Sequence, residues 1–148
     1  MAAERENIVA ALVTKIGTIT TGNGYQQDVG AVLDYPTNFS DIDYSDFPVV
    51  SIVLGGETAT DNLGSTVDNT LEIGLRCYVD GGDPDTIRTS ANKVVEDIKK
   101  LIYNNPTLDV SGVILCQVSN VEPPFIWLDV GDVGMVDINL SCLYRQTL

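Results

Sequence analysis

The sequence contains no histidine among its 148 residues. Histidine is the side chain that most often titrates near neutral pH, and it is also the commonest metal ligand in proteins. Its absence removes the Ser-His-Asp and Cys-His arrangements that activate nucleophiles. No phosphate-binding glycine loop follows a strand pattern, because Gly55-Gly56 opens a polar loop rather than a helix. The composition therefore predicts a protein that is not an enzyme.

Basic side chains are scarce, with 8 Lys and Arg against 21 Asp and Glu and a formal net charge of -13. The scarcity is local, since no Lys or Arg occurs from Ile16 to Leu75 or from Leu101 to Tyr144. Such a surface repels phosphate, so we expect no sequence-specific nucleic-acid partner. It also repels other copies of the chain, and any self-association is expected to depend on salt.

Cysteines are few and long apolar runs are lacking. Cys77, Cys116 and Cys142 are odd in number and lie far apart within apolar, strand-like runs. We interpret them as buried reduced thiols rather than as a disulfide or a reactive thiol, because free cysteine is among the most buried residue types. No segment approaches the roughly 18 apolar residues of a spanning helix, and the N-terminus lacks the cationic region of a signal peptide. We therefore expect a soluble, non-secreted protein without a membrane partner.

Four segments predict the strands of one sheet. Thr70 to Val79 and Val136 to Tyr144 alternate apolar and polar residues, which places one row on a core and the other toward water or a partner. Val49 to Leu54 is a more continuous apolar run that follows Pro48, and Val113 to Val121 is a further strand. These segments predict a single, mostly antiparallel sheet.

Two segments have the pattern of helices. The apolar residues of Pro84 to Tyr103 fall on one stripe at spacings of three and four, and Asp83 supplies an N-cap. Glu4 to Ile16 predicts a second helix, with Gly17 as its stop, and Tyr25 to Leu33 is a weakly patterned strand. Helices packed on the sheet give an α+β fold, and we expect residues 1–148 to form one domain.

The connection between the expected strands Val49 to Leu54 and Thr70 to Val79 predicts a protruding hairpin. We expect Gly55 and Gly56 to end the first of these strands, and the following Glu57 to Asp68 is small and polar. A segment of this kind between two strong strands forms a long β-hairpin whose tip stands clear of the core. Such an arm is either flexible or forms a contact with a neighbouring subunit. Its candidate contact residues are Thr58, Asn62 and Leu63.

The segment Asp34 to Phe47 combines aspartates with aromatic side chains. Its residues Asp41, Asp43 and Asp46 resemble the opening of a calcium-binding loop. The glycine and the terminal glutamate that an EF-hand needs at fixed later positions are absent. We therefore expect a solvated acidic loop, with no metal and no other cofactor.

A second loop, Glu122 to Val133, contains two prolines followed by Phe125, Ile126 and Trp127, the only tryptophan. Large apolar side chains in such a loop either fold back as a lid on the core or stay exposed for a partner. These three residues are therefore candidates for an interface.

The order helix, short strand, long hairpin, helix and two terminal strands resembles the tail terminator proteins of tailed bacteriophages, also called tail completion or minor tail proteins. The resemblance covers nearly the whole chain and contains no catalytic signature. It is carried by Arg5 to Leu12, Pro48 to Val53, Leu71 to Val79, Ala91 to Leu101 and Leu140 to Arg145. It implies a ring, usually a hexamer, on the head-proximal end of the tail tube, where it stops polymerisation and presents a surface to the neck or head.

The resemblance implies as partners further copies of this chain, the tail tube protein and a neck or head-completion protein, with assembly in the host cytoplasm. The insertion Asp34 to Phe47 is long for the compact core of the family, and the sequence leaves open which face it occupies. A neck or head-tail joining protein of the same virion is one alternative. A small acidic module that binds a peptide or regulates an enzyme is another.

The charge map indicates how copies could meet in a ring. Basic side chains are confined to the two expected helices, Arg76 and Arg145, while the hairpin and both loops are acidic or neutral. A head-to-tail contact could set the cations of one subunit near an acidic loop of the next. The candidate cations are Arg88, Lys93, Lys99 and Lys100.

Overall fold

The computed structural model describes residues 4–37, 41–42, 46–61, 64–126 and 133–147. Its elements in chain order are α1 (Glu4–Ile16), the 3-10 helix η1 (Thr21–Asn23), β1 (Ala31–Leu33), β2 (Val49–Asp61), β3 (Thr66–Asp80), α2 (Pro84–Asn104), β4 (Val113–Val121), β5 (Phe125–Ile126) and β6 (Val133–Thr147). The strands form one sheet in the order β1-β2-β3-β6-β4, with β5 paired to β6. The β1–β2 pair is parallel and the other described pairs are antiparallel, so the predicted α+β class is confirmed.

The centre of the sheet is the β3–β6 pair. Its register runs without a shift from Thr66 opposite Thr147 to Asp80 opposite Val133. The predicted alternation is confirmed in both strands, because one row of each is buried toward the helices. This row consists of Leu71, Ile73, Leu75, Cys77 and Val79 in β3 and of Val136, Ile138, Leu140, Cys142 and Tyr144 in β6.

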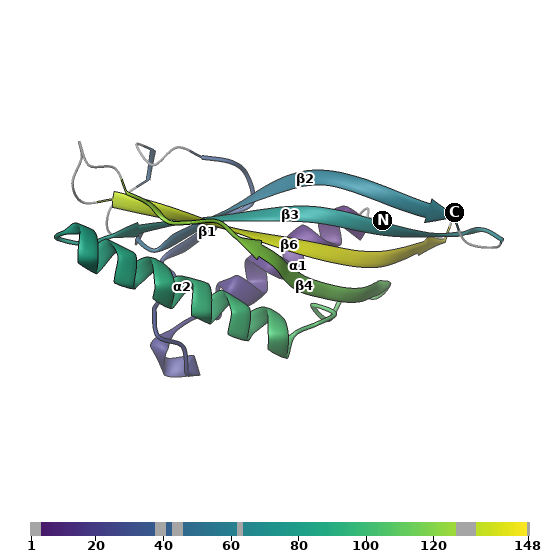
Figure 1. The fold of residues 1–148 in the computed structure, drawn as a ribbon. Helices are drawn as coiled ribbons and strands as arrows, with labels where there is room; N and C mark the ends of the chain where they lie inside the picture. The colour runs from purple at the N-terminus through teal and green to yellow at the C-terminus, as the bar shows by residue number, and fades with distance from the viewer. Residues whose placement is uncertain (1–3, 38–40, 43–45, 62–63, 127–132, 148) are drawn as a thin grey trace.

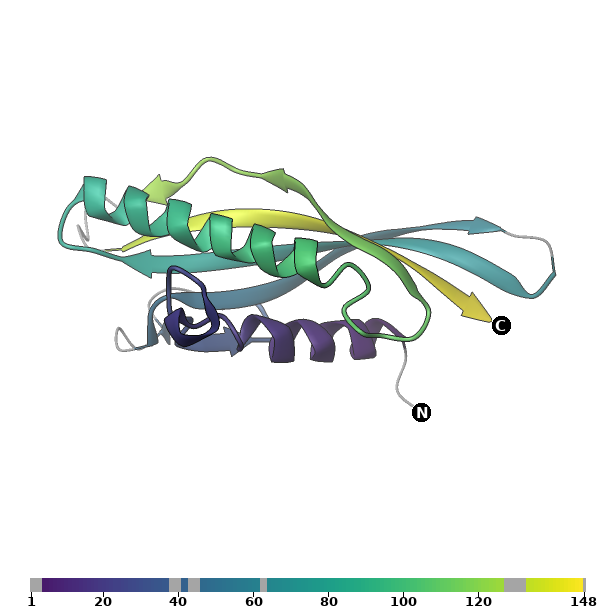
Figure 2. The same ribbon diagram turned by 90° about the horizontal axis from the view of Figure 1, so that it is seen from below.

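Both helices lie on one face of the sheet (Figures 1 and 2). The helix α2 packs on β3, β6 and β4 through the apolar stripe that the sequence predicts. The buried residues of this stripe are Ile87, Ala91, Val94, Val95, Ile98, Leu101 and Ile102. The helix α1 adds Ile8, Val9, Leu12 and Ile16 to the same core. One sheet face and two helices therefore enclose the hydrophobic core.

Two aspartates of the α2 region hold neighbouring backbone. The Asp83 side chain accepts a hydrogen bond from the Thr86 amide at 2.8 Å, which confirms the predicted N-cap and lowers the pKa of Asp83. Asp97 is buried within the helix, and its carboxylate accepts hydrogen bonds from the Gln26 and Gln27 amides at 2.9 Å. This second aspartate ties the segment after η1 to α2, a link that the sequence pattern does not reveal.

Three predicted boundaries are wrong. The strand expected over Tyr25 to Leu33 is only Ala31–Leu33, because the Gln26 and Gln27 amides donate to the Asp97 carboxylate and the Val29 amide donates to the Ile19 carbonyl instead of joining a strand ladder. Gly55 and Gly56 do not end β2; they form an irregularity in the β2–β3 ladder, which then continues to Asp61. The loop expected over Glu122 to Val133 contains the short strand β5.

The substitution Ile98→Asp is expected to unfold the protein. Ile98 is fully buried on the α2 stripe, so an aspartate there would be buried without a partner. The cost is several kcal/mol, against a total stability of roughly 5 to 15 kcal/mol for a domain. Thermal melting followed by circular dichroism measures the effect. Asn92→Asp, on the exposed side of the same helix, is the matched control, and an unchanged midpoint for Ile98→Asp would contradict the placement of α2.

Candidate interaction surface

The most prominent feature of the surface is an arm formed by the β2–β3 hairpin and the end of β6, which projects beyond both helices (Figures 1 and 2). We define the arm as residues 57–61, 66–71 and 142–147. In it, Thr58 pairs with Thr70, which in turn pairs with Leu143. The predicted hairpin is therefore confirmed. It is not a two-stranded ribbon, because β6 supplies a third strand along its length.

The base of the arm is joined to α1 by polar contacts on the helix side of the sheet. The Tyr144 hydroxyl donates a hydrogen bond to the Glu57 carboxylate, and Arg5 Nε lies 3.9 Å from the same carboxylate. Gln146 Nε2 donates to Glu4 Oε2 at 3.2 Å. Burial and the Glu57 hydrogen bond both raise the pKa of the Tyr144 phenol. These contacts hold β2, β6 and the start of α1 together where the arm leaves the core.

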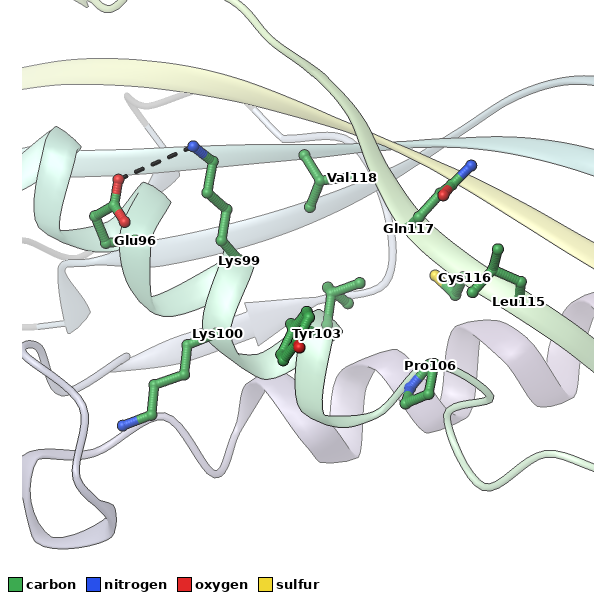
Figure 3. A pocket seen from close by; sticks show the side chains of 10 residues that line it. Glu96, Lys99, Lys100, Tyr103, Pro106, Leu115, Cys116, Gln117 and Val118 are labelled. Atoms are coloured by element: carbon green, nitrogen blue, oxygen red, sulfur yellow. Dashed lines mark ion pairs between the residues drawn. The ribbon is translucent and has the colours of Figure 1, made fainter.

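A groove lies between the C-terminal half of α2 and β4, which is the strand at one edge of the sheet (Figure 3). Large apolar side chains are exposed here: Tyr103 is 85% exposed, Leu115 is 40% exposed and Ile114, next to it in β4, is 43% exposed. The residues that line the groove are Glu96, Lys99, Lys100, Ile102, Tyr103, Pro106, Leu115, Cys116, Gln117 and Val118. An open apolar groove beside an edge strand is suited to binding an extended segment of polypeptide.

The sequence analysis did not identify this groove. The available signal was the composition of Val113–Val121, a nine-residue strand without a charged residue or a proline. Sheet edges that face water usually carry such residues as protection against pairing with other chains. The uncharged composition of this strand becomes informative only when the strand order is known, because that order places β4 at an edge of the sheet.

The four predicted cations lie along α2 in different surroundings. Lys100 donates to the Gly24 carbonyl at 2.8 Å and lies 5.1 Å from the centroid of the Tyr25 ring, and it points away from β4 in Figure 3. Lys99 is half exposed and lies 3.9 Å from Glu96. Arg88 and Lys93 line a separate shallow hollow nearer the start of the helix. The structure therefore brings Lys99 and Lys100 to the groove but not Arg88 and Lys93.

The acidic insertion lies on the face of the sheet opposite to the helices. Ser51 Oγ donates to the Tyr35 carbonyl at 2.6 Å, and the Tyr78 hydroxyl donates to the Thr37 carbonyl at 2.6 Å. Tyr78 belongs to the row of β3 that the sequence predicts to face water or a partner, but the insertion covers it and leaves it only 2% exposed. Burial also raises the pKa of Tyr78. The insertion thus covers the helix-free face at the end away from the arm.

The remaining predicted site residues are divided between separate places. Asp41 and Asp46 line one small pocket between the insertion and β1, and Asp43 lies outside the described residues. Phe125 is 53% exposed, as expected of a side chain that contacts a partner. Ile126 packs against the core, as expected of a side chain that folds back as a lid. Three further candidates lie outside the described residues: Asn62, Leu63 and Trp127.

The cysteines are buried and free, as predicted. Cys116 stands opposite Cys142 in the β4–β6 register, and burial raises the pKa of the Cys77 thiol. Across the described parts of the chain, no grouping of three or more Cys, Asp or Glu side chains could hold a metal ion. In the same residues, no helix has the length and apolar character needed to cross a membrane.

No protein-family model matches the sequence, and no curated protein matches it. Among solved structures, a chain from the virion of a native gene transfer agent (GTA) particle is similar over 93% of this chain and 86% of its own length. Its sequence identity is 12% and the TM-score is 0.49.

The substitution Tyr144→Phe is expected to weaken the base of the arm by about 1.5 kcal/mol, the typical contribution of a hydrogen bond to a charged group. Because the pKa of Tyr144 is raised in the folded state, its contribution is complete below the ordinary phenol pKa of about 10 and is lost as pH rises above it.

Urea unfolding at about pH 8 and about pH 10.5 tests this account. The wild type should lose more stability between the two pH values than Tyr144→Phe does. Tyr103→Phe, at an exposed position, is the matched control and should behave like the wild type. Equal alkaline losses for the wild type and Tyr144→Phe would show that the Tyr144 hydroxyl contributes nothing to the arm.

Proposed function

We propose that this chain is a structural virion protein that forms a hexameric ring on the head-proximal end of a phage tail tube. The ring terminates tube polymerisation and provides the joining surface to the neck or head. The observation that supports this most directly is the projecting arm, which places an exposed half of β2 on one edge of the sheet while the uncharged β4 forms the other edge.

Two unlike edges favour a ring over a symmetric dimer. A symmetric dimer uses the same patch on both subunits, whereas a contact between unlike patches proceeds head to tail and closes into a ring when the rotation allows. The position of the ring on a tail tube comes from the resemblance of the sequence to tail terminator proteins. The arm and the two edges supply the contacts that such a ring requires.

The charge of the chain explains how a ring could be restricted to the end of a tube. Each subunit carries a formal net charge of -13, so free copies repel one another. The repulsion is strongest below physiological ionic strength, where the Debye length exceeds about 8 Å. Contacts with a tube end would offset this repulsion. The free protein would then remain monomeric at low salt and form rings at high salt or on a completed tube.

The groove beside β4 favours one function of a different class, a small module that binds a peptide by strand addition. Ring formation separates the two proposals, because such a module has no need to form rings. A neck or head-tail joining protein would use the same arm and edges, and it differs from a terminator in having no effect on tube length.

The test is tail assembly in an extract that lacks this protein. We expect tubes of uncontrolled length without the protein and tubes of uniform length when the wild type is added back. A variant that lacks residues 58–66 should fail to restore uniform length although its core still melts cooperatively, and Trp127→Ala should restore it less well than the wild type. Electron microscopy gives the length distribution. Tubes of normal length in the absence of the protein would contradict the proposed function.

A further inference from the structure

The strand β4 is an edge that the monomer leaves only partly covered. The turn after α2 reaches its first half, where the Cys116 amide donates to the Pro106 carbonyl at 2.6 Å. From Gln117 onward its side chains are exposed or half-buried. With no charge and no proline in nine residues, this strand lacks the features that keep sheet edges from pairing with other chains. Such an edge is expected to be covered in the assembled protein.

The second half of β2 is the other uncovered edge. Among the described residues, β2 pairs beyond β3 only with β1, at Val49 to Ser51, and every residue from Leu54 to Thr60 is exposed. A side chain at Gly56 would meet nothing within 4 Å, so the strand presents bare backbone there. Glycine in a strand often marks a place where another backbone approaches closely. This stretch is long enough to pair with the open part of β4, from Gln117 to Val121.

We infer that residues 54–60 of β2 in one copy pair with residues 117–121 of β4 in the next copy, so that the sheet continues from subunit to subunit around the ring. This inference rests on the proposed function, which requires a ring. It identifies the occupant of the groove beside β4 as the arm of a second copy.

Charge favours this occupant over a second β4 strand. The half-exposed Lys99 lines the groove, so a symmetric β4–β4 contact would bring two groove lysines toward each other. The exposed half of β2 carries no Lys or Arg, and its Glu57, which Tyr144 and Arg5 already contact, lies on the helix side of the sheet, as Lys99 does. The head-to-tail contact therefore brings no second lysine to the groove, whereas the symmetric contact brings like charges together.

Disulfide cross-linking between engineered cysteines tests the pairing. Thr58 and Gln117 are exposed, and their ladder partners, Thr70 and Ser141, are on the helix-free face of the sheet. The three native cysteines are buried and should not compete. Thr58→Cys and Gln117→Cys proteins are mixed, assembled on tube ends and oxidised with copper phenanthroline. We expect a cross-linked dimer in the mixture but not with either variant alone, and a ladder of larger products from the double variant.

Two outcomes would overturn the inference. Cross-linking of Gln117→Cys with itself would show a symmetric β4–β4 contact, and an assembled mixture without any cross-link would show that these edges do not meet. Tube length is measured on the same samples. If tube length is controlled but no cross-link forms, the inference fails and the proposed function stands. If the cross-link forms without any effect on tube length, the proposed function fails.

A charge placed in the edge provides an independent test. Leu115→Lys should lower the association of copies about tenfold, because it replaces an apolar side chain of the contact with a charge that would lose hydration there. Thr14→Lys, on the exposed side of α1, makes the same change of charge away from both edges and should associate like the wild type. Equal association of the two variants, measured by light scattering, would contradict the inference.

Discussion

The pairing of β3 with β6 is the constraint on which the rest of this structure depends. Fifteen residues of each strand face each other without a register shift, and a slip by one residue would turn every buried side chain to the opposite face. Two bidentate ion pairs each join residues that stand directly opposite each other in this register. Arg76 binds Asp137 at 2.9 and 3.1 Å, which raises the pKa of Arg76, and Arg145 binds Asp68 at 2.8 and 3.1 Å. A strand rises about 3.3 Å per residue and a helix about 1.5 Å, so both strands extend farther than either helix that covers them. The same pairing therefore produces the arm.

The surface follows from what flanks this central pair. β2 lies on one side and β4 on the other, so the sheet ends in two different edges. Both helices cover one face, and the acidic insertion covers one end of the opposite face through the hydrogen bonds of Ser51 and Tyr78. Within the part of the chain that the structure describes, three surfaces stay open: the arm, the groove beside Tyr103 and Leu115, and the helix-free face near the arm. These open surfaces supply two unlike edges, which is the geometry that a head-to-tail ring requires.

Local patterns predicted the elements, and long-range pairing decided the features that the sequence did not reveal. Glu4–Ile16 and Val113–Val121 have the predicted bounds because periodicity and capping act within a few residues. The burial of Tyr78 and the role of Asp97 depend on segments about forty and seventy residues away, so no local pattern could indicate them. The arm could be predicted because a polar segment joins two strong strands. The groove could not, because its exposure depends on β4 being at the edge of the sheet.

We propose that the two unlike edges of the sheet meet in the assembled ring. Hydrogen–deuterium exchange tests it most directly, because exchange slows when a backbone amide gains a hydrogen-bond partner. The protein is compared as a monomer at low salt and as a ring on tube ends, with the amides of α2 as an internal reference. We expect slower exchange in the ring at both residues 54–60 and residues 117–121, with little change in α2. Unchanged exchange at either edge in rings that have formed would contradict it.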